Sequence, residues 1–330
     1  MTERRRPLRL LASAFARSQM EANVAQLMGS QPCSFVLPHE LHLNEGGCDL
    51  AFVSRDVTGS STKHDVKPAT QAFYDAMLAS TDLRWVHVHS AGIDRPVYVQ
   101  LQSRGVRVTP SVGANAVVVA QAALSGLLAL SRRLPLLMQA QRQRNWQPLH
   151  GDLLPRDLAG QRMTILGWGG IGQTLARYAQ MLGMQVSVVR HSGAPIEGLC
   201  SSVGYAQLHA VLPCTDWLVL ACPLSEQTRG LVSAAHLAAL PHGAHLINVS
   251  RGEVVDEPAL IAALQSGHLA GAYLDVFAQE PLPTASPLWE MPQVIVTPHC
   301  AGFSSGNAQR VMQMFLDQLR AMLCADINSG

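Results

Sequence analysis

A glycine-rich stretch in the middle of the chain has the residue types and spacing that bind a phosphate group. It follows the apolar run 163–166 and reads Gly167, Trp168, Gly169, Gly170, Ile171, Gly172. Gly167 permits a sharp turn, Gly169 lets the backbone approach a diphosphate, and Gly172 lets a following helix lie close to its strand. The first N–H groups of a helix are unpaired and carry partial positive charge, so they attract an anion without a cationic side chain. The stretch therefore predicts a dinucleotide site, with Gly170 and Ile171 at the helix start among its contacts.

The flanking sequence makes this interpretation specific. A helical pattern over 171–182 ends at Gly183, and the apolar run 184–189 predicts a second strand, so the glycines lie inside a strand-helix-strand unit. Without those flanks, the same spacing would also suit an ordinary loop in a chain with 26 glycines. The combination favours a dinucleotide-binding fold.

Three further side chains that can do chemistry each follow a different predicted strand. Arg251 comes after the run 245–249, Glu280 after 272–276 and His299 after 294–296. Taken singly, His299 is one of 13 histidines and could be an ordinary hydrogen-bonded residue, Arg251 a surface charge and Glu280 a loop carboxylate. The carboxyl ends of parallel strands meet at one end of a sheet, where such sheets bind their ligands, so the loops that carry these side chains are expected at one ligand site.

These residues must be positioned by alternating strands and helices, which predict parallel sheets with right-handed crossovers in two α/β domains. The last helix can return to the first domain. The predicted strands are 8–13, 34–37, 50–53, 85–89, 106–109, 163–166, 184–189, 217–221, 245–249, 272–276 and 294–296, and the predicted helices include 18–28, 70–79, 97–103, 114–130 and 307–323.

Composition indicates a compact protein that acts on a small molecule. The chain has 330 residues, of which 48% are hydrophobic and 14% charged, and its net charge of +1 gives no broad field for nucleic acid or an anionic membrane. Seven cysteines without metal-ligand spacing predict reduced thiols in the cytoplasm and no metal site. The apolar stretch 114–130 is too short and too interrupted to span a bilayer, so we expect a buried or interface helix. Arg4, Arg5 and Arg6 precede the first predicted strand, and an Arg-rich transit peptide is the alternative interpretation of this end.

The ordered set of motifs resembles the D-isomer-specific 2-hydroxyacid dehydrogenases over nearly the whole chain. The matching segments are Ser90-Ala91-Gly92-Ile93-Asp94, Cys222-Pro223-Leu224, Asn248-Val249-Ser250-Arg251-Gly252, 274–282, Pro287-Leu288-Trp289 and Thr297-Pro298-His299-Cys300-Ala301-Gly302. The resemblance implies two doubly wound parallel-sheet domains, with a Rossmann domain (112–298) inserted into a flavodoxin-like substrate domain (1–111 and 299–330).

The resemblance also implies a role for each motif residue. Arg251 binds the substrate carboxylate and carbonyl, His299 is the acid/base, and Glu280 is the partner of His299. The turn Ser90, Ala91 and Gly92 helps to hold the substrate carboxylate, although it could be an ordinary strand-helix turn. Further cofactor contacts are Cys222, Pro223, Ser250 and Asp275; Asp275 binds the nicotinamide carboxamide, or simply caps a turn.

Physical chemistry makes these roles reasonable. An arginine fork can hold a planar carboxylate with charge-assisted hydrogen bonds. Hydride arrival puts negative charge on the carbonyl oxygen, and an imidazolium can neutralise it by proton transfer, which contributes roughly 10²- to 10⁴-fold. A neighbouring carboxylate favours the charged imidazole.

The cofactor prediction depends on the end of the second strand. An NAD-binding unit usually has Asp or Glu there for the ribose hydroxyls. This chain has Arg190, His191 and Ser192, which offer a cation and a hydroxyl to a 2′-phosphate and favour NADPH. Alternatively, Arg190 stacks on adenine, which leaves NAD open.

We therefore expect a cytoplasmic, NADPH-preferring reductase of glyoxylate or hydroxypyruvate that forms homodimers through the helix 114–130. The alternatives are a D-lactate or other 2-oxo acid dehydrogenase that uses NAD, and a non-catalytic dinucleotide-sensing corepressor on the same fold. Trp146 resembles a tryptophan that some hydroxypyruvate reductases present across a dimer interface, or it packs in a core. Ser54 and Arg55 could reach the distal group of the substrate or remain solvated, and Cys300 is expected to have a packing role.

Overall fold

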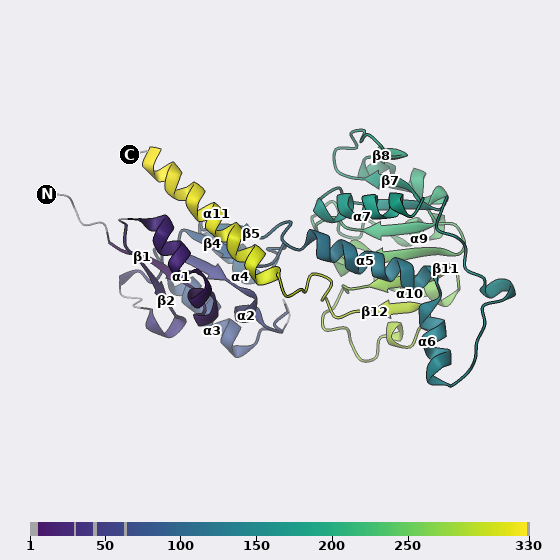
Figure 1. The fold of residues 1–330 in the computed structure, drawn as a ribbon, viewed down its shortest axis with the longest axis horizontal. Helices are drawn as coiled ribbons and strands as arrows, with labels where there is room; N and C mark the ends of the chain where they lie inside the picture. Colours follow the sequence, from purple (N-terminus) through teal and green to yellow (C-terminus); the bar gives the residue numbers. More distant parts are fainter. Residues whose placement is uncertain (1–5, 30, 42–44, 63–64, 329–330) are drawn as a thin grey trace. The chain divides into compact units, whose positions relative to one another are not determined.

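The computed structural model describes residues 6–29, 31–41, 45–62 and 65–328, in two compact units (Figure 1). Unit 1 comprises Met1–Asn115 and Ser304–Gly330, and unit 2 comprises Ala116–Phe303. Both boundaries lie a few residues beyond the positions 111 and 298 expected from the sequence. His299 lies in unit 2. Ala301, two residues further along the chain, is buried in the core of the same unit. Arg4 and Arg5 lie outside the described residues.

A parallel sheet in the order β2-β1-β3-β4-β5 forms the middle of unit 1. The strands are β1 (Leu8–Leu11), β2 (Cys33–Val36), β3 (Leu50–Val53), β4 (Trp85–Val88) and β5 (Arg107–Pro110). This is the flavodoxin-like order, in which β2 lies on one side of β1 and the later strands are added on the other side, so the switch point is between β1 and β3.

Helices cover both faces of this sheet. One face packs against α1 (Ala14–Met28) and α11 (Asn307–Asn328), which lie side by side in Figure 1, and the other against α3 (Pro68–Ala79) and α4 (Pro96–Ser103). The short α2 (Arg55–Thr58) follows β3. Helix α1 begins earlier than the sequence predicts, because the Ser13 hydroxyl accepts a hydrogen bond from the N–H of Ala16 (3.0 Å) and caps the first turn.

Unit 2 contains a larger parallel sheet in the order β12-β11-β10-β9-β6-β7-β8. Its strands are β6 (Arg162–Leu166), β7 (Gln185–Val189), β8 (Ser201–Val203), β9 (Trp217–Leu220), β10 (Ala244–Asn248), β11 (Leu269–Leu274) and β12 (Val294–Val296). The order reverses between β6 and β9, as in a Rossmann sheet, with β12 added at one edge. The predicted pair of doubly wound domains is confirmed. The short strand β8 was missed by the sequence analysis, because Ser201 and Ser202 give it no apolar pattern.

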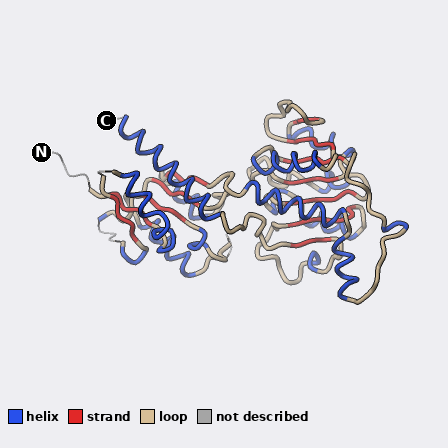
Figure 2. The backbone as a smooth tube through the Cα atoms, in the orientation of Figure 1, coloured by secondary structure: helices blue, strands red, loops and turns tan. Residues whose placement is uncertain are grey.

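Helices again lie on both faces of the sheet (Figure 2). α5 (Ala116–Ser131) and α7 (Gly170–Met181) pack on one face, and α8 (Leu208–Val211), α9 (Ala234–Ala239) and α10 (Glu257–Gln265) on the other. α6 (Leu134–Arg142) follows α5. Among the described residues, no single helix is long and apolar enough to cross a bilayer, whereas the bent pair α5 and α6 meets the length and composition test jointly, with a 68° bend.

Two buried histidines lie in or next to β4. His87 is fully buried, and its ring nitrogens contact the hydroxyls of Thr109 (2.9 Å) and Ser111 (2.9 Å). Burial lowers the pKa of His87 to about 4. Burial, followed by the charges of Arg55 and Arg95 and by His87, lowers the pKa of His89 to about 3. Both rings are therefore neutral in the folded protein at neutral pH.

We expect these histidines to make folding sensitive to acid. The unfolded chain protonates an imidazole near pH ~6.5, so between that pH and about 4 the unfolded state binds more protons and stability falls as pH is lowered. Each such ring contributes a slope of up to ~1.4 kcal/mol per pH unit in this range. Urea unfolding at several pH values should give a smaller acid-side slope for His87→Gln than for the wild type. Equal slopes would contradict this account.

Candidate active site

A hydrogen-bonded side-chain pair between the loops that follow β11 and β12 forms the centre of the site. His299 Nδ1 lies 2.7 Å from Glu280 Oε2, and Glu280 Oε1 accepts a hydrogen bond from the N–H of Phe277 (3.1 Å). The His299 side chain is 47% exposed, and that of Glu280 is 19% exposed. Because Nδ1 is occupied by the carboxylate, Nε2 is the ring nitrogen that can exchange a proton with a ligand.

The charge state of Glu280 follows from its neighbours. Burial alone would raise the pKa of this carboxyl, but the hydrogen bond and charge of His299, the N–H of Phe277 and the charge of Arg251 together lower it below its usual range. Glu280 is therefore ionised at neutral pH, and it presents a negative charge to the imidazole. Arg251 lies close enough to contribute to this field, so the structure brings the three predicted residues together.

Asp275 holds the loop that carries His299. Its buried carboxylate accepts hydrogen bonds from the Thr297 hydroxyl (2.6 Å) and from the N–H groups of Cys300 (2.9 Å) and Ala301 (3.0 Å). Its backbone carbonyl accepts a fourth from the N–H of His299 (2.8 Å). His299 has a positive φ of 51°, a conformation that non-glycine residues adopt only where surrounding contacts hold it.

Asn248 and Gly252 position Arg251. The buried Asn248 side chain accepts from the N–H (3.0 Å) and hydroxyl (2.8 Å) of Ser250 and donates to the carbonyl of Arg251 (3.1 Å). A Cβ at Gly252 would lie 1.9 Å from the backbone carbon of Phe277, so only glycine allows this close approach. The approach brings the Arg251 loop against the loop that carries Glu280.

The glycine-rich turn forms as the sequence predicts. Gly167 has a φ of 107°, and a Cβ there would lie 2.7 Å from the carbonyl oxygen of Ala221. The first hydrogen bond of α7 runs from the N–H of Gln173 to the carbonyl of Gly169 (3.0 Å), so the earlier N–H groups of the helix are available to an anion. A Cβ at Gly169 would meet no atom within 4 Å. This open space beside a helix N-terminus fits the diphosphate of a dinucleotide.

Arg190 follows β7, at the place where a dinucleotide ribose would be recognised. Its Nη2 donates to the carbonyl of Ala194 (2.7 Å), and its Nε is buried without a hydrogen-bond partner among the described residues. His191 contacts Gln227 through Nδ1 (2.8 Å), and Ser192 is exposed. The guanidinium N–H groups that Ala194 does not use are donors, and they can hydrogen-bond to a phosphate oxygen or to a ribose hydroxyl oxygen.

Other predicted contacts of the cofactor line the same edge of unit 2. Cys222 and Pro223 follow β9, where the backbone of Cys222 lies against Gly167. The hydroxyl of Ser250 donates a hydrogen bond to the side chain of Asn248.

The two cysteines near the site are not activated thiols. Burial raises the pKa of the Cys222 thiol to about 11. Burial, together with the charge of Asp275, raises the pKa of the Cys300 thiol, so neither is poised as a nucleophile.

The predicted substrate turn belongs to unit 1. Ser90, Ala91 and Gly92 follow β4, and the Ser90 hydroxyl donates to the carbonyl of Gly92 (2.8 Å). Ser54 and Arg55 line a separate cavity of about 270 Å³ in the same unit, together with His89 and Asn307. The Oδ1 atom of Asn307 is buried there without a hydrogen-bond partner in the described part of the chain.

Trp146, after α6 in unit 2, is 93% exposed, which excludes the interpretation that it packs in the core of this chain.

Sequence reasoning missed the residues that hold the loops. Asn248, Thr297 and the loop-holding role of Asp275 were not predicted, although each is a polar residue at or just after the end of a parallel strand of unit 2. Their position at the end of a strand was the sequence signal that could have identified them.

Among the described residues, no group of three or more His, Cys, Asp or Glu side chains could hold a metal ion.

The chain is similar to proteins of a known family. Residues 124–301 match the family model "D-isomer specific 2-hydroxyacid dehydrogenase, NAD binding domain". The (S)-sulfolactate dehydrogenase of Chromohalobacter salexigens is 34% identical over 78% of this chain and 83% of its own length. The glyoxylate/hydroxypyruvate reductase B of Yersinia enterocolitica is 35% identical over 75% of this chain and 77% of its own length.

Solved structures of proteins named for the same family have the same fold as this chain. A D-isomer specific 2-hydroxyacid dehydrogenase from Xanthobacter autotrophicus in complex with NADPH and MES superposes with a TM-score of 0.73 and 29% identity, covering 96% of each chain. A family protein from Aeromonas salmonicida gives a TM-score of 0.77 and 27% identity, covering 97% of each chain. Because the family model spans more than half of its residues, this chain belongs to the D-isomer-specific 2-hydroxyacid dehydrogenases, NAD(P)-dependent oxidoreductases that interconvert 2-oxo acids and D-2-hydroxy acids.

Proposed function

We propose that this chain reduces glyoxylate or hydroxypyruvate, with NADPH as the preferred cofactor. The observation that carries the proposal is the His299–Glu280 pair at 2.7 Å, next to the Arg251 loop and in the unit that holds the glycine-rich turn. Relatives named as glyoxylate reductase and glyoxylate/hydroxypyruvate reductase, at 32% and 35% identity, support this choice of substrate.

The proposed mechanism assigns one task to each side chain. Arg251 holds the planar carboxylate of the 2-oxo acid and orients its carbonyl. A bound reduced nicotinamide supplies the hydride. As negative charge develops on the carbonyl oxygen, His299 donates its Nε2 proton to that oxygen, and the product is the 2-hydroxy acid. Glu280, 2.7 Å from Nδ1, stabilises the imidazolium before transfer and keeps the ring oriented.

Ser90, Ala91 and Gly92 are proposed to assist in holding the substrate carboxylate. Gly167, Gly169, Gly170, Ile171 and Gly172 are proposed to hold the diphosphate, with Cys222, Pro223, Ser250 and Asp275 as further contacts. Asp275 is supported chiefly as a positioning residue, because its carboxylate already accepts hydrogen bonds from the loop of His299.

A panel of 2-oxo acids with both cofactors tests the proposal. Glyoxylate and hydroxypyruvate should give the highest kcat/KM, and NADPH should be preferred over NADH. Pyruvate as the best substrate with NADH would favour the D-lactate alternative. Tight dinucleotide binding without turnover of any 2-oxo acid would favour the sensing corepressor instead.

Substitution at Arg190 tests the cofactor assignment. A phosphate–guanidinium contact contributes roughly 1.5 to 3 kcal/mol, or about 10- to 150-fold. Arg190→Asp removes this contact and repels the 2′-phosphate, so the ratio of kcat/KM for NADPH over NADH should fall by at least that factor, mainly through KM. Arg177→Asp on the exposed face of α7 is the matched control. An unchanged ratio in Arg190→Asp would make Arg190 an adenine-stacking or surface residue.

Neutral replacements at the ion pair test the catalytic roles. His299→Gln should lower kcat/KM by about 10²- to 10⁴-fold, because it removes the proton donor. Glu280→Gln keeps one oxygen that can accept from His299 Nδ1, but it loses the charge and the second acceptor that the N–H of Phe277 uses. Its loss of kcat/KM should still be smaller than that of His299→Gln, because the imidazole remains. Dinucleotide affinity should be unchanged in both, and His209→Gln, at an exposed position, should behave as the wild type. A wild-type rate for His299→Gln, with chemistry rate-limiting, would remove His299 from its role.

We further infer a cytoplasmic homodimer that has no nucleic-acid or membrane partner. α5 buries one side against the sheet yet exposes Val117 (50%) and Leu128 (38%), and α6 exposes Met138 (51%). Covering these side chains with a second copy removes apolar surface from water. Light scattering that gives the mass of one 35.5-kDa chain at micromolar concentration would contradict the dimer.

A further inference from the structure

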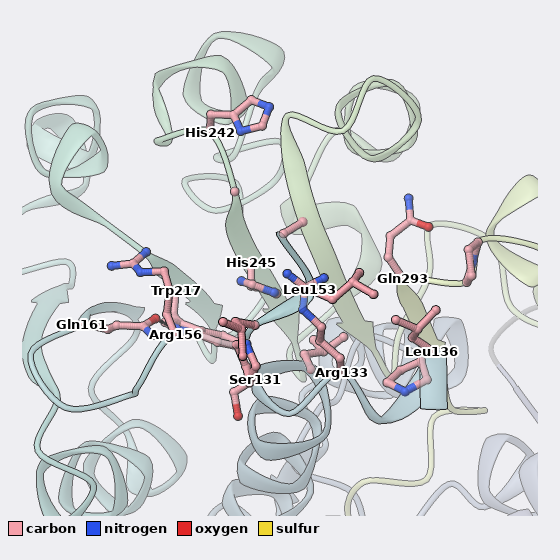
Figure 3. Close-up of a pocket in the computed structure, with 17 residues that line it drawn as sticks. Ser131, Arg133, Leu136, Leu153, Arg156, Gln161, Trp217, His242, His245 and Gln293 are labelled. Carbon is pink, nitrogen blue, oxygen red and sulfur yellow. Dashed lines mark hydrogen bonds between the residues drawn. The ribbon is translucent and has the colours of Figure 1, made fainter. Parts of the chain in front are cut away.

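A cavity in unit 2 lies at the amino-terminal ends of the strands, opposite to the candidate active site at their carboxyl-terminal ends. It is lined at the amino-terminal ends of the strands by Trp217 of β9, His245 of β10 and Ala270 of β11, and by residues of α5, α6 and the segment 153–156 (Figure 3). The glycine-rich turn and the catalytic loops instead follow the carboxyl-terminal ends of the strands. The cavity volume is about 440 Å³, which is within the range of roughly 300 to 1,000 Å³ found for small-molecule sites.

The floor of this cavity is a flat aromatic pair. His245 and Trp217 are paired in register on neighbouring strands, and their rings stack with centroids 4.2 Å apart and planes 11° from parallel. Trp217 Nε1 donates to Gln161 (2.7 Å), which satisfies the polar edge of the indole. Burial, and then the charges of Arg133 and Arg156, lower the pKa of His245 to about 4. The ring is therefore neutral and offers an apolar face to a ligand.

The walls combine apolar side chains with positive charge. Leu130, Leu136 and Leu153 supply apolar surface, and no acidic residue is among the described side chains that line the cavity. Arg156 is paired with Asp216 (3.0 Å). Arg133, by contrast, has no carboxylate partner among the described residues; it donates one hydrogen bond, from Nη2 to the carbonyl of Asp152 (3.1 Å).

The backbone of Arg133 has an unusual conformation at the junction of two helices. It joins α5 to α6 with φ 54° and ψ 31°, a left-handed conformation that a non-glycine residue rarely adopts. Figure 3 shows Arg133 and His245 directed into the same space. A guanidinium has five N–H donors, so the groups that Asp152 does not use can bind an anion in a fork.

We propose that this cavity binds a small organic acid with a flat apolar body, whose anionic group pairs with Arg133 while the body lies on the His245–Trp217 stack. The site is separate from the dinucleotide and 2-oxo acid sites, and it does not depend on the proposed substrate. The ligand is an anion because, among the residues that the structure describes, Arg133 has no carboxylate partner and no acidic side chain lines the cavity. Its body is flat and apolar because the face of the neutral His245 ring and the leucine side chains form the apolar part of the lining.

The aromatic sulfonate 1-anilinonaphthalene-8-sulfonate is a suitable probe, because its fluorescence rises in an apolar site. The titration is done once with saturating NADP⁺ and once with saturating NAD⁺, so that the dinucleotide site is occupied. One equivalent of the sulfonate should still bind per chain in both titrations. Arg133→Gln should weaken this binding about tenfold or more, whereas Arg132→Gln, at the exposed neighbouring position, should not. The uncharged N-phenyl-1-naphthylamine should bind the wild type and Arg133→Gln equally.

Ala270→Phe provides an independent test that does not alter charge. Ala270 is exposed and lines the cavity, so a phenyl ring there should fill the space and block both probes without unfolding the chain. All variants should keep the wild-type thermal midpoint and 2-oxo acid reductase activity. Displacement of the sulfonate by dinucleotide, equal affinity in Arg133→Gln, or no effect of Ala270→Phe would overturn the proposal. Loss of probe binding as protein concentration rises would also overturn it, because a second copy would then occupy the cavity.

Discussion

The buried carboxylate of Asp275 is the group on which the geometry of the His299–Glu280 pair depends. It lies directly after β11 and accepts hydrogen bonds from three groups of the chain that leaves β12, while its own carbonyl accepts the N–H of His299. A left-handed residue other than glycine costs of order 1–3 kcal/mol. Each hydrogen bond to a charged group contributes roughly 1.5 to 3 kcal/mol, so the set can hold His299 in that conformation. The imidazole is thereby fixed against Glu280 before any ligand arrives.

A second constraint is the backbone contact between the Arg251 and Glu280 loops. The missing side chain at Gly252 allows the two backbones to touch, and Asn248 fixes the chain just before that point. The cationic and anionic side chains therefore converge without a long flexible reach. This convergence explains the lowered pKa of Glu280, because the carboxylate is near His299 and Arg251 at once and its burial does not offset their effect.

The two ends of the strands in the unit 2 sheet carry different kinds of side chain. At the carboxyl-terminal edge, polar side chains hold irregular loops through hydrogen bonds, as required where backbone groups leave the sheet. At the amino-terminal edge, the His245–Trp217 stack and leucine side chains leave a cavity whose charge comes from arginine. Helix α5 extends between them, with Ala116 close to Gly170 at one end and Leu130 lining the cavity at the other.

The sequence by itself determined the local elements and which residues are candidates for the active site. Apolar runs, glycine positions and strand ends are local signals, so the strands at 50–53 and 294–296, the glycine-rich turn and the triad of Arg251, Glu280 and His299 could be predicted without coordinates. Only the tertiary structure decided that His299 belongs to unit 2, that Asp275 holds its loop, and that Trp217 and His245 stack under a charged cavity. These facts depend on which atoms meet across distant parts of the chain. Residue type and spacing do not specify such contacts, because they arise from strand register and side-chain packing.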